Sequence, residues 1–316
     1  MTEDAKHLKT RFISDMNLPI SVIAEPYFGN SLAILEIEYG AKTKYNELWD
    51  VIIDRFNASP QKFLEYYHQV RDNIITSVIN SDAYKEFLED KELLKDIKPI
   101  VGNRNLYTQE QDGCLFISYD MKKANFQALK YYNPSIVYDS ETYEDFIGHF
   151  TDLQYIKESK YTRQVIFGKM NPKRTMTLEK QITNSLAKTL VDNYKSQNLE
   201  PFSLNADEII FKFNGNEEDF EKIGGEDITF EGVKYKFSKF KLHSRLFKRC
   251  DSETILDVYQ KEDYLNHHRR ILKGAPSTYF NQIYKLLHGI KITPLDLVFY
   301  YEHELCKFLN QLELIK

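Results

Sequence analysis

Apolar residues recur with the period of an α-helix along the first third of the chain. Residues 44–56 carry Leu48, Val51, Ile52 and Phe56 at helical spacing. A second helix is predicted from Pro60 to about residue 80, because a serine N-cap precedes a proline that fits the first helical turn. A third is expected from residue 82 to 94. Residues 1–18 are polar and are expected to be mobile.

The pattern changes near residue 113, where β-forming residues replace the helical period. Residues 114–119 read CLFISY and predict a buried strand that ends at Asp120. A helix is expected over 122–131. Farther along, 202–204 and 208–213 are apolar and flank a short polar turn, which predicts a β-hairpin with acidic residues at its tip.

Helical and extended patterns alternate again in the last part of the chain. Asn171-Pro172 predicts the start of a long helix to about residue 196. Residues 233–247 predict a strand with its aromatic residues facing inward, which requires a bulge at Ser238. Two proline-initiated helices, over 276–287 and 294–314, are expected to end the chain, with Thr293 capping the second.

These elements predict an α+β fold with an antiparallel sheet backed by helices. A helical N-terminal region is assigned to residues 1–100, the sheet domain with inserted helices to 101–247, and a helical C-terminal region to 248–316. The first boundary lies in a proline- and glycine-containing stretch, KPIVGNRN, over 98–105.

Composition narrows the possible functions. The 316 residues are 42% hydrophobic, enough for a sizeable core, and the net charge of −5 does not indicate general nucleic-acid binding. Three isolated cysteines favour a reducing compartment. No signal peptide or membrane span is predicted, so an intracellular, cytoplasmic protein is expected. Motifs for P-loop, Rossmann, zinc-protease and serine-hydrolase chemistry are absent from the sequence.

Acidic residues at strand ends are the main candidates for chemistry. Asp120 and Asp207, with Glu208 as an accessory, could hold Mg²⁺ or Mn²⁺ against phosphate oxygens. The alternative for Asp120 is a helix N-cap, and for Asp207 a simple turn aspartate.

Two groups of cations are candidates for binding phosphate. The first group surrounds the start of the helix predicted after residue 171, where main-chain N–H groups already favour anions. It consists of Arg163, Lys169, Lys173, Arg174 and Lys180. The second group could follow a nucleic-acid backbone. It consists of Lys234, Lys236, Lys239, Lys241, Arg269 and Arg270. For the first group the alternative is solvation or pairing with acidic side chains, and for the second it is a solvated sheet edge.

The two acidic segments resemble the palm of template-dependent nucleic-acid polymerases. FISYDMKKA, residues 116–124, is similar to motif A of reverse transcriptases and family A DNA polymerases. ADEIIF, residues 206–211, resembles motif C of family A, with Ala206 where that motif has histidine. The resemblance covers about 113–213, and the family's fingers pattern of Arg, Lys and Tyr-Gly on one helix is not reproduced.

The resemblance implies that the sheet domain is a palm-like catalytic domain with inserted fingers-like helices. It also implies a small polymerase or nucleotidyltransferase with nucleic acid and a nucleoside triphosphate as partners. Asp120 and Asp207 would be the metal ligands. Asn125, five residues after Asp120, would lie beneath the incoming sugar and tolerate ribonucleotides, unless Phe126 occupies that place and excludes them. Small size and composition suggest a viral or phage member acting in an infected cell. A catalytically silent palm-like binding factor and a metal-dependent nuclease are the alternatives.

Overall fold

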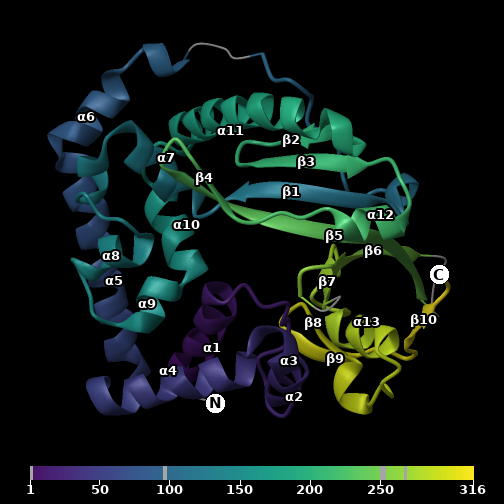
Figure 1. Ribbon diagram of the computed structural model, residues 1–316. Coiled ribbons are helices and arrows are strands. Elements are labelled where there is room, and N and C mark those ends of the chain that lie inside the picture. Colours follow the sequence, from purple (N-terminus) through teal and green to yellow (C-terminus); the bar gives the residue numbers. More distant parts are fainter. Residues whose placement is uncertain (1–2, 95–97, 250–253, 267–268) are drawn as a thin grey trace.

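The structure is a computed structural model that describes residues 3–94, 98–249, 254–266 and 269–316. Within these ranges it is a mixed α+β protein, in which an antiparallel sheet of eight strands lies among thirteen α-helices (Figure 1). The predicted fold class is therefore confirmed. None of the helices in these ranges is both long and apolar enough to cross a membrane.

The sheet joins segments that are far apart in the sequence. Six strands follow the order β2-β3-β1-β5-β6-β7, and β4 and β10 also pair with β5. The predicted strands at 114–119, 202–204 and 208–213 correspond to β1, β2 and β3, which are neighbours. The bounds are β1 Leu115–Met121, β2 Leu199–Leu204, β3 Glu208–Phe213, β4 Ile228–Phe230, β5 Val233–Arg249, β6 Ile255–Asp263, β7 Arg269–Lys273 and β10 Leu312–Leu314.

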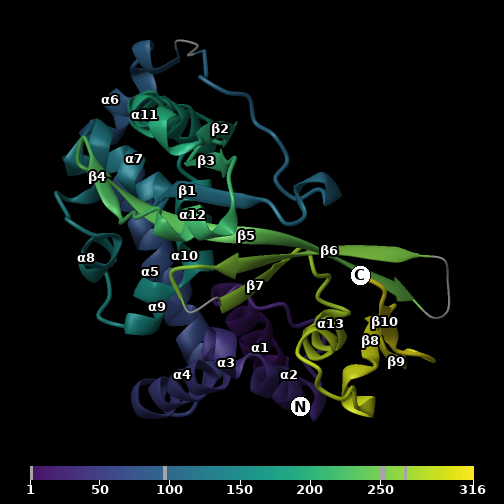
Figure 2. The ribbon, with the colours of Figure 1, turned by 45° about the vertical axis from the view of Figure 1, so that its right-hand side comes forward.

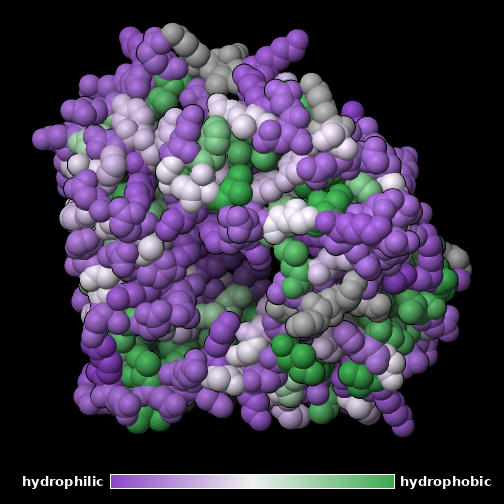
Figure 3. All heavy atoms as spheres, viewed as in Figure 1, coloured by the Kyte–Doolittle hydropathy of each residue, from purple (hydrophilic) through white to green (hydrophobic). Residues whose placement is uncertain are grey.

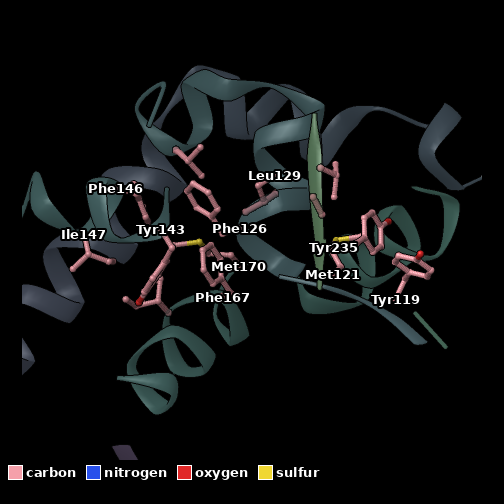
Figure 4. Packing of buried hydrophobic residues seen from close by; sticks show 14 of the residues in the cluster. Tyr119, Met121, Phe126, Leu129, Tyr143, Phe146, Ile147, Phe167, Met170 and Tyr235 are labelled. Atoms are coloured by element: carbon pink, nitrogen blue, oxygen red, sulfur yellow. The ribbon is translucent and has the colours of Figure 1, made fainter. Parts of the chain in front are cut away.

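Alternation along β1 separates two hydrophobic clusters. Tyr119 and Met121 belong to the main core, where α7 (Ala124–Tyr132) and α11 (Pro172–Tyr194) pack against the sheet. Phe116 belongs to a second cluster with Phe240. Because successive side chains on a strand point to opposite faces, Asp120 shares the face of Phe116, away from these two helices. Figure 4 shows the main core at the end of β1.

Helices form a wall beside the sheet. The serine cap predicted before Pro60 is present, since Ser59 Oγ accepts a hydrogen bond from Lys62 N. Ser81 Oγ likewise accepts a hydrogen bond from Tyr84 N. The helices of this wall are α1 Glu3–Asp15, α2 Tyr27–Ile34, α3 Glu36–Tyr39, α4 Ala41–Phe56, α5 Pro60–Asn80, α6 Asp82–Glu89, α8 Tyr143–Gly148, α9 Gln154–Glu158 and α10 Lys160–Gly168.

The N-terminal prediction of a mobile start is wrong for the described residues. Residues 3–15 form α1, because Leu8 and Phe12 are fully buried and fix the helix against the main core. The third predicted helix is also shorter than expected. It ends at Glu89, and a 3₁₀ turn follows over Glu92–Leu94.

The C-terminal region contains more strand than the sequence suggests. Thr293 does form a capping box, but it opens only a 3₁₀ turn, Pro294–Asp296. The β-forming run that follows makes a hairpin of β8 (Val298–Tyr301) and β9 (Glu304–Lys307). The predicted helix over 294–314 is therefore wrong. Among the described residues after 248, the one α-helix is α13, Phe280–Leu287, which corresponds to the helix predicted over 276–287.

The C-terminal elements return to the N-terminal helices, as Figures 1 and 2 both show. Asn281 Nδ2 donates to Ser31 Oγ at 3.0 Å, and Asn30 Nδ2 donates to Asp296 Oδ1 at 2.9 Å. The main core includes residues from all three predicted parts of the chain. The division at residues 100 and 247 stays a prediction.

Candidate functional site

Strand pairing brings the predicted acids together at one end of the sheet. β1 and β3 are antiparallel, and Asp120 lies opposite Glu208. Met121 N donates to Asp207 O at 2.8 Å, which extends the ladder to the tip of the hairpin. Asn205 N donates to Glu208 O at 2.9 Å and closes the turn. Residues separated by more than eighty positions in sequence are therefore fixed as neighbours by main-chain hydrogen bonds.

The acids repel one another electrostatically. Burial raises the pKa of Asp120 to about 7, and the charges of Glu208 and Asp207 add to the effect. Lys261 and Lys236 act in the opposite direction without cancelling it. The side chain of Asp120 is nevertheless accessible to solvent. An accessible carboxylate with a strongly raised pKa is typical of a functional cleft.

A buried carboxylate that the sequence analysis did not identify lies behind these acids. Glu179, on α11, is only 5% exposed, and its Oε1 accepts a hydrogen bond from Asn125 Nδ2 at 2.7 Å. Burial and the charge of Asp207 raise the pKa of Glu179 to about 7. The available signal was its position in the buried stripe of α11, four residues from Thr175 and from Thr183, which are both buried.

Arg163 is the predicted cation that lies within electrostatic reach of Asp120. It lies on α10, and its guanidinium carbon is 5.8 Å from the centroid of the Tyr143 ring. Burial lowers the pKa of Arg163, while Tyr143, Glu144 and, with the smallest effect, Asp120 act in the opposite direction.

The other predicted phosphate-binding cations are dispersed. Arg174 is buried, and its guanidinium donates to the main-chain oxygens of Phe87 and Asp90 at the end of α6. The expectation that it lines a cleft is therefore not met. Lys169 and Lys173 are exposed, and Lys180 borders a cavity beside the hairpin tip.

The lysines of β5 do not share one face. No register shift interrupts β5 where it pairs with β1, so the predicted bulge at Ser238 is absent from this pairing, and both faces of the strand are covered. Lys234 and Lys236 therefore lie on the face opposite to Lys239 and Lys241.

Individual contacts separate these lysines further. Lys239 is buried and donates to two main-chain oxygens, those of Glu221 and Ile223, while Lys241 pairs with Glu217 at 2.7 Å. Lys234 and Lys236 remain exposed. Arg269 and Arg270 begin β7, but their side chains lie outside the described part of the structure.

Lys261, on β6, was missed because nothing in the sequence places β6 beside the acid end. Its Nζ lies 4.1 Å from the centroid of the Phe240 ring. Burial lowers the pKa of Lys261, and the charges of Glu208 and Asp120 oppose that effect. It thus supplies positive charge on the face that carries Asp120.

Phe126 cannot serve as a sugar-contacting residue in this structure. It is fully buried, with its ring centroid 6.2 Å from those of both Tyr143 and Phe146 (Figure 4). Asn125 is partly exposed and lies on the side of Glu179. The helical register therefore favours Asn125 over Phe126 at the predicted sugar position.

The face shown in Figure 3 is hollowed near its centre, and the hollow is surrounded mainly by hydrophilic residues. In the matching view of Figure 1 it lies below the sheet and beside α10. Across the described ranges, no group of three or more His, Cys, Asp or Glu side chains is arranged to hold a metal ion. Comparisons with protein-family models, curated proteins and solved structures find no match to this chain.

Proposed function

We propose that this protein is a metal-dependent nucleotidyltransferase of the polymerase palm type, which transfers a nucleotide from a triphosphate to the 3′ hydroxyl of a nucleic acid. One observation carries the proposal: Asp120 and the Asp207-Glu208 pair meet at the ends of adjacent strands. The sheet is covered on its other face by α7 and α11, which leaves Asp120 and Glu208 on the side away from these helices. Asp207 lies at the end of the strand, where its charge also acts on Glu179 of α11.

The chemical type of the donors suits Mg²⁺ or Mn²⁺, although the described side chains form no group of three ligands. Carboxylate oxygens are the ligands that these hard cations prefer, and Asp120 and Asp207 would be the principal ones. Burial is the larger cause of the raised pKa of Asp120, and repulsion by Glu208 and Asp207 adds to it. A bound cation would relieve that repulsion. Metal ions bound there would neutralise charge on the triphosphate and favour ionisation of the attacking hydroxyl.

The surrounding residues would bind and orient the substrates. Arg163 would donate hydrogen bonds to phosphate oxygens, since within the described residues its guanidinium has an aromatic ring but no carboxylate or carbonyl as a hydrogen-bond partner. Lys261 would approach the nucleic-acid strand on the same face of the sheet. Asn125 would lie beneath the sugar, held by its hydrogen bond to Glu179.

A catalytically silent palm-like factor that binds nucleic acid is the second candidate. The absence of a three-ligand group among the described side chains favours it, as does Ala206 in place of the motif C histidine. Such a factor would keep the basic residues and bind nucleic acid without turnover.

Primer extension distinguishes the two candidates. Wild-type protein is incubated with a primed template, Mg²⁺ or Mn²⁺, and separate ribo- and deoxynucleotide pools, with Asp207→Asn as the matched control. Extension by the wild type that is lost in Asp207→Asn supports the enzyme. Binding of the primed template without extension under any of these conditions contradicts the enzyme and supports the silent factor.

A further inference from the structure

A cavity of about 370 Å³ lies beside the hairpin that carries Asp207. Its walls come from three separate segments: residues 99–103, the first half of α11, and the turn after β2. The cavity is independent of the acids themselves, because neither Asp120 nor Glu208 lines it. The lining residues are Pro99, Val101, Asn103, Thr177, Lys180, Gln181, Asn184, Leu204, Asn205 and Ala206.

Asn184 supplies a buried hydrogen-bond donor to this cavity. The residue is 2% exposed, and its Oδ1 accepts a hydrogen bond from Ile100 N at 3.0 Å. That bond fixes the orientation of the amide, while Nδ2 has no partner in the described part of the chain. A buried donor without an acceptor costs free energy, and a ligand that carries an acceptor would recover it.

The remaining lining matches the parts of a nucleotide. Val101 and Leu204 offer apolar surface against which a flat base can pack. Lys180 is exposed on the cavity wall and can neutralise a phosphate. Gln181 Nε2 donates to Leu93 O, and its carbonyl oxygen, which has no hydrogen-bond partner among the described residues, can accept from a base.

A second cavity, of about 250 Å³, lies between the first cavity and the acid site. It contains Arg104, Tyr107 and Glu208, and it shares Asn103 and Asn205 with the first cavity. The two cavities therefore adjoin one another around the hairpin tip. A strand that passes the acid site can extend along them, with Arg104 and Lys180 as cations on its path.

We infer that the larger cavity holds one unpaired nucleotide of the bound nucleic-acid strand, with its base hydrogen-bonded to Asn184 Nδ2 and its phosphate beside Lys180. The inference rests on the proposed function for the identity of the strand, but it requires no catalysis. Every base carries at least one ring-nitrogen or carbonyl acceptor, so the site is expected to tolerate any sequence.

Single abasic substitutions in the strand test this inference. Binding of a labelled primer–template with a 12-nucleotide single-stranded overhang is measured by fluorescence anisotropy in EDTA. One abasic site is moved along the overhang, and the duplex junction fixes the register of the strand. One position should weaken wild-type binding about two- to tenfold, the range of a single net hydrogen bond. Asn184→Ser and the cavity-filling Thr177→Phe should lose this position dependence.

Thr189→Phe is the matched control for Thr177→Phe. Both threonines lie on α11 and donate to a main-chain oxygen four residues earlier, but Thr189 does not line the cavity. Thr189→Phe should keep the wild-type profile. A flat wild-type profile, or position dependence that survives in both cavity variants, overturns the inference.

Primer extension on the same preparations separates this inference from the enzymatic proposal. Extension with a flat abasic profile would refute the nucleotide-binding cavity alone. A position-dependent profile without extension would support the cavity and contradict the transferase.

Discussion

The acid end of the sheet and the cationic segment at residues 163–180 differ in whether the fold brings their charged side chains together. The acids lie on adjacent strands, where the main-chain ladder fixes Asp120 opposite Glu208. The cations lie on two helices and the turn between them, where successive residues point in directions about 100° apart. Sequence proximity therefore says little about which cations converge, whereas strand register fixes which acids do.

Two arginines from this segment show the difference most clearly. Arg174 directs its guanidinium to the main-chain oxygens of Phe87 and Asp90, which would otherwise remain open at the end of α6. Arg163 contacts the Tyr143 ring and lies within the electrostatic influence of Asp120. The first arginine completes the fold, and the second is the one that the proposed function assigns to a substrate. Variants at these positions should therefore separate stability from activity.

Asp120→Asn should have the largest effect on activity and should not destabilise the apoprotein. Losing a metal ligand should reduce nucleotide incorporation by on the order of a thousandfold or more, since metal-stabilised charge contributes several kcal/mol to the transition state. The same change removes repulsion from Asp207 and Glu208, so thermal unfolding in EDTA should occur at the same or a higher temperature. Wild-type incorporation rates in the variant would contradict the assignment of Asp120.

Glu179 should make stability depend on pH. Its pKa is raised to about 7 from 4.5, so the native state binds this proton more tightly than the unfolded chain does. The resulting stabilisation is complete below pH 4.5 and is lost as pH rises to about 7, a change of roughly 3 kcal/mol.

Glu179→Gln should remove that component, because glutamine does not titrate and its amide oxygen can still accept from Asn125. Denaturant unfolding in EDTA at several pH values measures the difference between wild type and variant. Glu158→Gln, at an exposed position on α9, is the control and should follow the wild-type curve. Equal pH dependence in wild type and Glu179→Gln would show that this carboxylate is not buried as described.

The sequence predicted those features that depend on local pattern. The buried strand that leads to Asp120, the serine cap before Pro60, and the hairpin before Ile209 follow from residues close together in the chain, although β1 continues one residue past Asp120 to the buried Met121. What covers each face of a strand does not follow from residues close together in the chain. Lys239 reads as a solvent-facing residue, but α12, Glu217–Lys222, lies over that face, and the lysine donates to the main-chain oxygens of Glu221 and Ile223. Glu179 was missed for the same reason, since its environment is created by tertiary packing.

Arg163→Met and Arg174→Met should have opposite consequences. Arg174→Met leaves the two carbonyl groups at the end of α6 without their partner and should lower the free energy of unfolding by about 2 kcal/mol. Its nucleotide KM should remain unchanged in the folded fraction. Arg163→Met should raise KM and lower kcat/KM by about ten- to a hundredfold, as expected for a lost charged hydrogen bond. A shift of KM in Arg174→Met with no loss of stability would reverse these assignments.

The smallest expected effect concerns the choice of sugar, and Asn125 carries it. Its Nδ2 donates to Glu179, so Oδ1 is left to accept a hydrogen bond from a 2′ hydroxyl. One such bond contributes about 0.5–1.5 kcal/mol, which corresponds to a several-fold to tenfold preference and permits ribonucleotides without requiring them. Asn125→Ala should remove this preference in incorporation assays with matched ribo- and deoxynucleotides and leave deoxynucleotide kinetics unchanged.

Phe126→Ala should instead destabilise the protein by about 3–5 kcal/mol, because its ring fills the core, and should not alter sugar selection. Complete rejection of ribonucleotides by the wild type, relaxed in Phe126→Ala but not in Asn125→Ala, would transfer the role to Phe126 and show that α7 adopts another register in the complex.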